Sequence, residues 1–179
     1  MMSKRKIFIA LTGITSILAM NVASAGNQAG STTLTLSDAY YAFAQKRHLN
    51  NTSMPNASIA YNFTPSWAIE GSVGVLNPNQ KSGYSGLKYH GFLYTVDGLY
   101  RFTPCGLFEP YALAGVGILG LKPSGTDSTW LANINAGVGT QFFVDNSIAL
   151  RVEAKDIYTM SGGKNDVMVN FGVSFLFGG

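Results

Sequence analysis

The sequence is poor in the side chains from which most catalytic and metal sites are built. It has one cysteine, Cys105, and two histidines, His48 and His90, in 179 residues. A single cysteine excludes an intramolecular disulfide framework. Two histidines on different connecting segments are a weak basis for a metal site. Charged residues make up only 12% of the chain. We therefore expect no metal and no cofactor.

Long apolar runs are also missing, apart from one near the start. Residues 1–6 are basic, residues 7–20 are uncharged and largely apolar, and Ala23-Ser24-Ala25 follows. This order is typical of a cleaved signal peptide. The apolar run is short for a spanning helix and contains hydroxyl side chains, which argues against a retained anchor. The sequence predicts a signal peptide over residues 1–25 and a single domain over residues 26–179.

The basic character of the chain comes from that leader. The chain has 12 lysines and arginines against 9 acidic residues, and Lys4, Arg5 and Lys6 belong to the predicted signal peptide. Its removal leaves nine basic and nine acidic side chains. The pI near 9.0 therefore gives no argument for nucleic-acid binding.

What the sequence does have is glycine, aromatic residues and a period of two. In the last stretch, every second residue is large and apolar, and the residues between them include Asn170, Gly172 and Ser174. The apolar set is Val167, Val169, Phe171, Val173, Phe175 and Phe177. This alternation places one apolar face and one polar face on an extended segment.

Similar segments recur along the chain and predict eight strands. They cover residues 36–45, 57–63, 67–75, 89–102, 108–121, 130–142, 148–158 and 167–177. Short connections near residues 64–66, 103–106, 145–146 and 162 alternate with longer ones at 46–55, 77–88 and 122–128. This alternation is typical of an all-β, eight-stranded antiparallel up-and-down transmembrane β-barrel. The facing of the first and fifth strands stays unassigned.

Charged residues lie opposite the apolar rows. They are Glu70, Asp97, Arg101, Arg151, Glu153 and Lys155. A soluble sandwich would leave such a face in solvent, but the nearly unbroken apolar rows favour a barrel with these charges in its lumen. We expect them to pair with one another in a polar, side-chain-filled interior.

Aromatic residues gather near the strand ends, where the two bilayer interfaces would lie. Those at the side of the short turns are Phe63, Trp67, Phe102, Phe142 and Phe177, and those at the side of the longer connections are Tyr89, Trp130 and Tyr158.

Three segments resemble a known family. Residues 109–117 read Glu-Pro-Tyr-Ala-Leu-Ala-Gly-Val-Gly, residues 137–139 read Gly-Val-Gly before Ala-Leu-Arg-Val-Glu at 149–153, and residues 171–177 close the chain. Together they resemble the small OmpA-like and OmpX-like outer-membrane barrels, without the peptidoglycan-binding domain of full-length OmpA.

The resemblance implies a location in the bacterial outer membrane, in contact with lipid and lipopolysaccharide. It also implies handling by periplasmic chaperones and the barrel-assembly machinery. The assembly signal would lie in the last strand, at Phe171, Val173, Phe175 and Phe177.

One glycine motif suggests a different function and is set aside. Residues 115–120 match G-x-G-x-x-G, but Lys122-Pro123-Ser124-Gly125 follows where a dinucleotide site would need a helix. Small residues in a crowded barrel strand explain the motif better.

An enzymatic function has little support in the sequence. Some barrels resembling this one modify lipid A with a serine, a histidine and a carboxylate. Here His48 and His90 lie on different connections, with Ser124 and Asp127 as loop neighbours, and no local Ser/His motif is present. We expect a non-enzymatic protein.

The expected function is therefore that of an outer-membrane barrel that contributes to envelope integrity, to surface interaction through its outer loops, or to both. A host or surface ligand would bind those loops. The alternatives are a small low-conductance pore and a lipid A-modifying enzyme.

Overall fold

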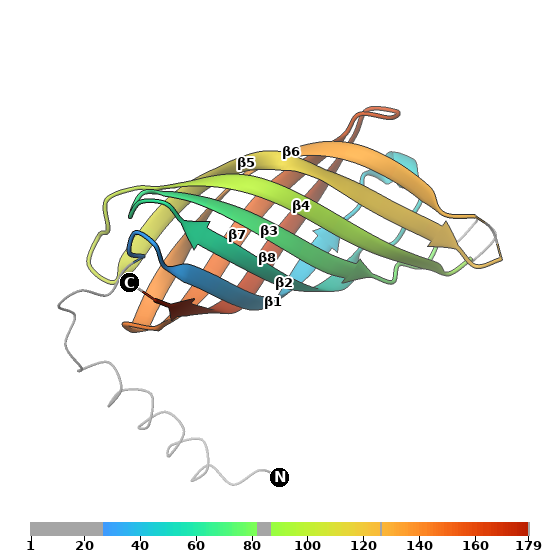
Figure 1. The fold of residues 1–179 in the computed structure, drawn as a ribbon. Helices are drawn as coiled ribbons and strands as arrows, with labels where there is room; N and C mark the ends of the chain where they lie inside the picture. Colours follow the sequence, from blue (N-terminus) through green and yellow to red (C-terminus); the bar gives the residue numbers. More distant parts are fainter. Residues whose placement is uncertain (1–26, 82–86, 126, 179) are drawn as a thin grey trace, which may run out of the picture.

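The computed structural model describes residues 27–81, 87–125 and 127–178, which form a closed antiparallel β-barrel (Figure 1). The strands are β1 (Thr32–Ala42), β2 (Thr52–Asn62), β3 (Trp67–Leu76), β4 (Tyr89–Arg101), β5 (Phe108–Pro123), β6 (Thr129–Asp145), β7 (Ile148–Thr159) and β8 (Lys164–Phe177). The predicted eight-stranded up-and-down barrel is confirmed. The predicted signal peptide and its cut lie outside the described residues.

The described part of the chain has little helix. A single 3-10 turn, η1 (Gln45–Arg47), follows β1. No helix in this part is both long enough and apolar enough to cross a bilayer.

The barrel closes through pairing of the first and last strands. Following paired residues around the sheet from Thr32, through all eight strands, returns to β1 at Ala42. The sheet is therefore staggered by ten residues over one circuit, and a stagger of this size requires steeply tilted strands. Eight strands enclose an interior that side chains can fill.

The two ends of the barrel differ. The β2–β3, β4–β5 and β6–β7 turns lie at the end of the barrel where β1 begins and β8 ends, and the other four connections lie at the opposite end (Figure 1). Short turns face the periplasm in outer-membrane barrels, and longer loops face outward. We therefore call the first the periplasmic end and the second the outer end. One periplasmic turn is fixed by Thr64, whose Oγ1 accepts a hydrogen bond from the Trp67 amide at 2.9 Å.

Four predicted strand boundaries are wrong at the outer end, and one of them is the start of the last strand, predicted at residue 167 but found at Lys164. The first strand was predicted at residues 36–45 but ends at Ala42, and the predicted loop 46–55 already belongs to β2 from Thr52 onward. The predicted loop 122–128 is shortened because β5 continues to Pro123. Backbone pairing, such as Tyr41 with Thr52, continues there without regard to side-chain polarity, so hydrophobic alternation does not mark where a strand stops.

The predicted facing is confirmed for six strands. The apolar rows of β2–β4 and β6–β8 point outward; Trp67, Val138 and Phe171 are 56%, 64% and 58% exposed. Such a surface suits the hydrocarbon of a bilayer. The alternate residues of each strand point into the lumen.

The structure assigns the two strands whose facing the sequence left open. On β1, Leu36 and Tyr40 face outward, whereas Ala39 and Tyr41 are buried inside. On β5, Val116 and Ile118 face outward, and the inner row is Tyr111, Leu113, Leu119 and Leu121. Both strands carry large apolar side chains on both faces.

The aromatic residues follow the predicted two groups with one exception. Tyr89 was predicted at the outer bilayer interface, but its ring packs inward against the buried cluster that contains Leu121. Residues Trp130 and Tyr158 are exposed on the outside, as predicted.

Candidate functional site

Arg151 on β7 is the centre of a buried ion cluster in the periplasmic half of the lumen. Its guanidinium donates to both carboxylate oxygens of Glu70, at 2.5 and 2.9 Å, and to Glu153 at 2.5 Å. Its Nε donates to the hydroxyl of Tyr111 at 2.7 Å, and that hydroxyl donates to Glu153 at 2.9 Å. The planar guanidinium suits this arrangement because its donors form a rigid fork that matches carboxylates.

Three further ion pairs extend the cluster along the barrel. Lys155 donates to Asp97 at 2.7 Å and lies 3.6 Å from Glu153. Arg101 lies 3.5 Å from Glu109, and Asn27 donates to the same carboxylate. The groups cross the lumen between β3, β4, β5 and β7, so the pairs tie distant strands together.

Glycines on the inner faces of β5 and β6 make room for this cluster. A Cβ at Gly115 would lie 2.2 Å from the Asp97 carboxylate, and one at Gly139 would lie 2.3 Å from the Tyr111 hydroxyl. The G-x-G-x-x-G stretch is therefore part of a crowded strand, and β5 continues through it.

The structure brings the six charged residues predicted for the lumen into one half of it. All six are at most 3% exposed. Sequence reasoning missed Glu109 and Tyr111, which complete the cluster from β5. Their signal was the Glu-Pro-Tyr stretch, whose alternate residues point inward once the facing of β5 is known.

The polar ion cluster occupies the periplasmic half of the lumen, beside a small apolar group of Ala68, Leu99, Tyr111 and Leu113. Toward the outer end the lumen is filled by a buried apolar cluster of Ala39, Tyr41, Phe43, Leu49, Met54, Leu76, Leu93, Leu119, Leu121, Ile157 and Met168. We call this set the apolar layer. The prediction of a polar lumen is wrong for this half, because inward-facing Leu and Met were not separable from lipid-facing ones by alternation alone.

A buried ion pair fastens the β1–β2 connection over the outer mouth. Arg47 of η1 lies 2.9 Å from Asp166 on β8 and donates to Thr159 at 2.5 Å. The same carboxylate accepts bonds from the Tyr41 hydroxyl at 3.0 Å and the Ala44 amide at 2.8 Å. His48 then adopts a left-handed conformation with φ of 54°, and the chain turns so that Leu49 enters the apolar layer.

Basic residues are segregated at the outer end. Of the nine that follow the predicted signal peptide, Arg101, Arg151 and Lys155 lie in the periplasmic half of the lumen. The other six all belong to the outer connections or to strand ends beside them: Lys46, Arg47, Lys81, Lys88, Lys122 and Lys164. These six basic residues outnumber the acids of the same region, among them Asp127 in the β5–β6 connection and Asp166, which pairs with Arg47. The outer end is therefore electropositive.

The contacts at the outer end give no support to a lipid A-modifying enzyme. The Nδ1 atom of His90 lies 2.8 Å from the Asn77 side-chain oxygen, and the Ser124 hydroxyl donates to the Lys88 carbonyl at 3.1 Å. A serine nucleophile would instead need to contact its histidine base. In the described ranges, no three histidine, cysteine or acidic side chains cluster as metal ligands would.

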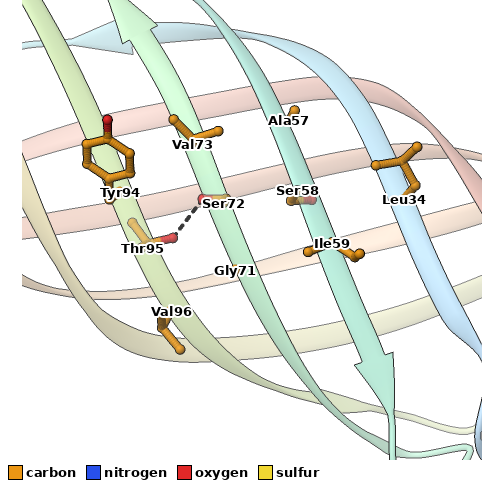
Figure 2. A pocket seen from close by; sticks show the side chains of 10 residues that line it. All are labelled: Leu34, Ala57, Ser58, Ile59, Gly71, Ser72, Val73, Tyr94, Thr95 and Val96. Carbon is orange, nitrogen blue, oxygen red and sulfur yellow. Dashed lines mark hydrogen bonds between the residues drawn. The ribbon is translucent and has the colours of Figure 1, made fainter.

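The outer wall carries an apolar groove of about 550 Å³ across β2, β3 and β4 (Figure 2). Figure 2 shows Ile59, Val73 and Val96 standing around the bare backbone of Gly71. The Ser72 and Thr95 hydroxyls, 2.8 Å apart, bond to each other on the lumen side. The lining of the groove is therefore almost entirely apolar, which suits hydrocarbon of the bilayer.

The assembly signal expected in β8 lies at the lipid-facing surface. Phe171 and Phe177 are 58% and 55% exposed, and Phe177 pairs with Thr32 at the periplasmic end. Their role in assembly stays a prediction. Cys105 is exposed in the β4–β5 turn.

The family follows from the sequence and the fold together. The model of the outer membrane protein beta-barrel domain matches residues 7–177. The chain belongs to the outer-membrane β-barrel family. The membership places the protein in the bacterial outer membrane and agrees with the resemblance to small OmpA-like barrels. No curated protein sequence matches the chain.

Solved structures share the fold at low sequence identity. The N-terminal barrel of Pseudomonas aeruginosa OprF has a TM-score of 0.64 and 19% identity, and covers 84% of this chain and 100% of its own. OprG from the same organism has a TM-score of 0.65 and 12% identity, with 87% and 100% covered. The attachment invasion locus protein Ail of Yersinia pestis, in complex with the heparin analogue sucrose octasulfate, has a TM-score of 0.60 and 17% identity. The match covers 84% of this chain and 100% of Ail.

Proposed function

We propose that this protein is a closed, non-enzymatic barrel that holds an electropositive surface at the outer face of the membrane, where it binds phosphorylated or sulfated sugars. These groups occur on lipopolysaccharide and on sulfated polysaccharides of other surfaces. Binding the first would contribute to envelope integrity, and binding the second to surface interaction. The observation that carries the proposal is the segregation of six basic residues at the outer end.

The positions of the lysines suit an anionic layer that begins at the bilayer edge. Lys122 is exposed on the outward row of β5, paired with His90 of β4. Lys88 is exposed just before β4, and Lys81 lies earlier in the same connection. Lysines beside an anionic membrane surface each contribute about 1 kcal/mol of attraction, and several acting together form a binding surface.

The filled lumen supports a function in binding at the outer surface rather than in ion conduction. An ion cluster occupies the periplasmic half and the apolar layer occupies the outer half. Ions would have to displace both, so the outer surface is the part of the molecule left free to interact. Ail, which shares the fold, was captured with a highly sulfated sugar, and this supports the same class of ligand.

The test compares two triple variants at the same positions. Lys81→Gln, Lys88→Gln and Lys122→Gln remove three charges, whereas arginine at the three sites keeps them. With the barrel in nanodiscs, we expect the glutamine variant to bind heparin and deacylated lipopolysaccharide at least about tenfold more weakly. The arginine variant should match the native chain.

The two sugars separate the two roles. Loss of binding to the lipopolysaccharide saccharide alone would point to envelope integrity, and loss of heparin binding alone to a surface ligand. Equal binding of native and glutamine forms to both sugars would overturn the proposal.

A further inference from the structure

A small cavity opens at the outer mouth of the barrel, above the apolar layer. It has a volume of about 290 Å³, and its lining includes Lys46, Arg47, Leu49, Tyr89, Leu121, Leu131 and Lys164. We call it the mouth cavity. Its volume lies at the lower end of the range for small-molecule sites.

The walls of the mouth cavity come from opposite sides of the barrel. The β1–β2 connection, held down by the Arg47–Asp166 pair, supplies one side. The inward rows of β5 and β6 supply the other side through Leu121 and Leu131. The cavity is thus built on strands and a fastened connection, so its shape is set by backbone pairing.

The lining is divided by polarity. Leu49 and Leu121 are buried at 3% and 8% exposure, and half-buried Tyr89 and Leu131 pack against the same apolar layer. Lys46 and Lys164 also line the cavity, and within the described ranges no salt bridge involves either of them. Arg47 is already neutralised by Asp166. The cavity therefore has an apolar floor beneath two ammonium groups without a carboxylate partner.

We infer that the mouth cavity binds a single-chain amphiphile with an anionic head, of the class of a medium-chain fatty carboxylate. The chain would lie over Leu121 and bury the exposed apolar surface of half-buried Leu131 and Tyr89. The carboxylate would accept charge-assisted hydrogen bonds from Lys46 and Lys164. A cationic head would be repelled, and a short acid would leave the floor uncovered.

The inference is separate from the proposed surface function. The sugars would bind Lys81, Lys88 and Lys122, none of which lines the mouth cavity. Either site can fail its test without affecting the other.

The test follows methyl signals of the leucines in the nanodisc-embedded barrel by NMR while decanoate is added. Leu121 and Leu131 report on the mouth cavity, whereas lipid-facing Leu36 and Leu150 report on decanoate that merely dissolves in the bilayer. We expect saturable shifts for the first pair and shifts proportional to added decanoate for the second. Butanoate and decyltrimethylammonium should give no saturable shift.

Two double variants complete the design. Lys46→Gln with Lys164→Gln should raise the decanoate midpoint at least about tenfold, because two charge-assisted bonds are lost. Lys81→Gln with Lys122→Gln removes the same charge outside the cavity and should leave the midpoint unchanged. A boiling-dependent gel shift verifies that each variant is folded.

Three results would overturn the inference. They are shifts of Leu121 and Leu131 that only parallel those of Leu150, a midpoint that is the same in both double variants, and equal binding of the cationic amphiphile.

Discussion

Arg151 shows how one side chain determines the interior around it. It contacts Glu70, Glu153 and Tyr111 at 2.5 to 2.9 Å, at 3% exposure. Burying a charge is costly unless its partners are in place, and removing one partner leaves the others uncompensated. Removing Arg151 is therefore costly mainly because it would leave the carboxylates of Glu70 and Glu153 buried without a cation.

We predict that Arg151→Ala destabilises the barrel by about 3–5 kcal/mol. The measurement is urea unfolding in detergent, followed by the loss of the heat-modifiable gel band. The matched control is Arg151→Met combined with Glu70→Gln and Glu153→Gln, which removes the charges together and should recover much of the loss. An Arg151→Ala variant as stable as the native chain would contradict this account of the cluster.

For single residues, the alternation of polar and apolar side chains on β3, β4 and β7 was enough to predict which charged side chains lie in the lumen. The alternation could not predict which of them form ion pairs. The bonds from Arg151 on β7 to Glu70 on β3 cross the lumen, and such contacts depend on the stagger of the whole sheet. Glu109 was missed for a local reason: it lies on β5, where large side chains occur on both faces.

At the scale of single strands, β1 and β5 show the limit of reading a barrel from hydrophobicity. Apolar residues mark the lipid face only while the inner face is polar. In the outer half of this barrel both faces are apolar, since Tyr41 and Leu119 belong to the apolar layer while Tyr40 and Ile118 face outward. Which face of β1 points inward follows from its pairing with β2 and β8, and that of β5 from its pairing with β4 and β6. Hydrophobic alternation alone does not give this pairing.

Two glycines on different strands provide a test of this inside–outside distinction. A Cβ at Gly115 on the inner face of β5 would lie 2.2 Å from Asp97 and from the Val96 carbonyl oxygen, whereas a Cβ at Gly71 on the outer face of β3 would meet nothing within 4 Å. We predict that Gly115→Ala lowers stability by about 1–3 kcal/mol, the usual cost of overpacking, and that Gly71→Ala does not lower it. Urea midpoints of the two variants decide the matter, and equal midpoints would contradict the assigned faces.

For the whole molecule, the stacking of an ion cluster and an apolar layer predicts a barrel that does not conduct. Purified protein in planar bilayers should give no steady channel, even at high load. Arg151→Ala should also be silent, because the apolar layer above it is unchanged. Discrete conductance steps whose size changes in Arg151→Ala would instead establish the small-pore alternative.

The pairing of β1 with β8 has a consequence for biogenesis. Thr32 pairs with Phe177, so contacts that close the sheet join the two ends of the described chain. Until β8 is in place, β1 exposes a row of unpaired backbone amides and carbonyls. In water such an edge strand can pair with other chains and aggregate, and in lipid its backbone groups lack hydrogen-bond partners. No shorter run of these strands can close the circle. A chain that stalls before Lys164 is thus a candidate for degradation, and release of a finished barrel into the bilayer is an all-or-none event.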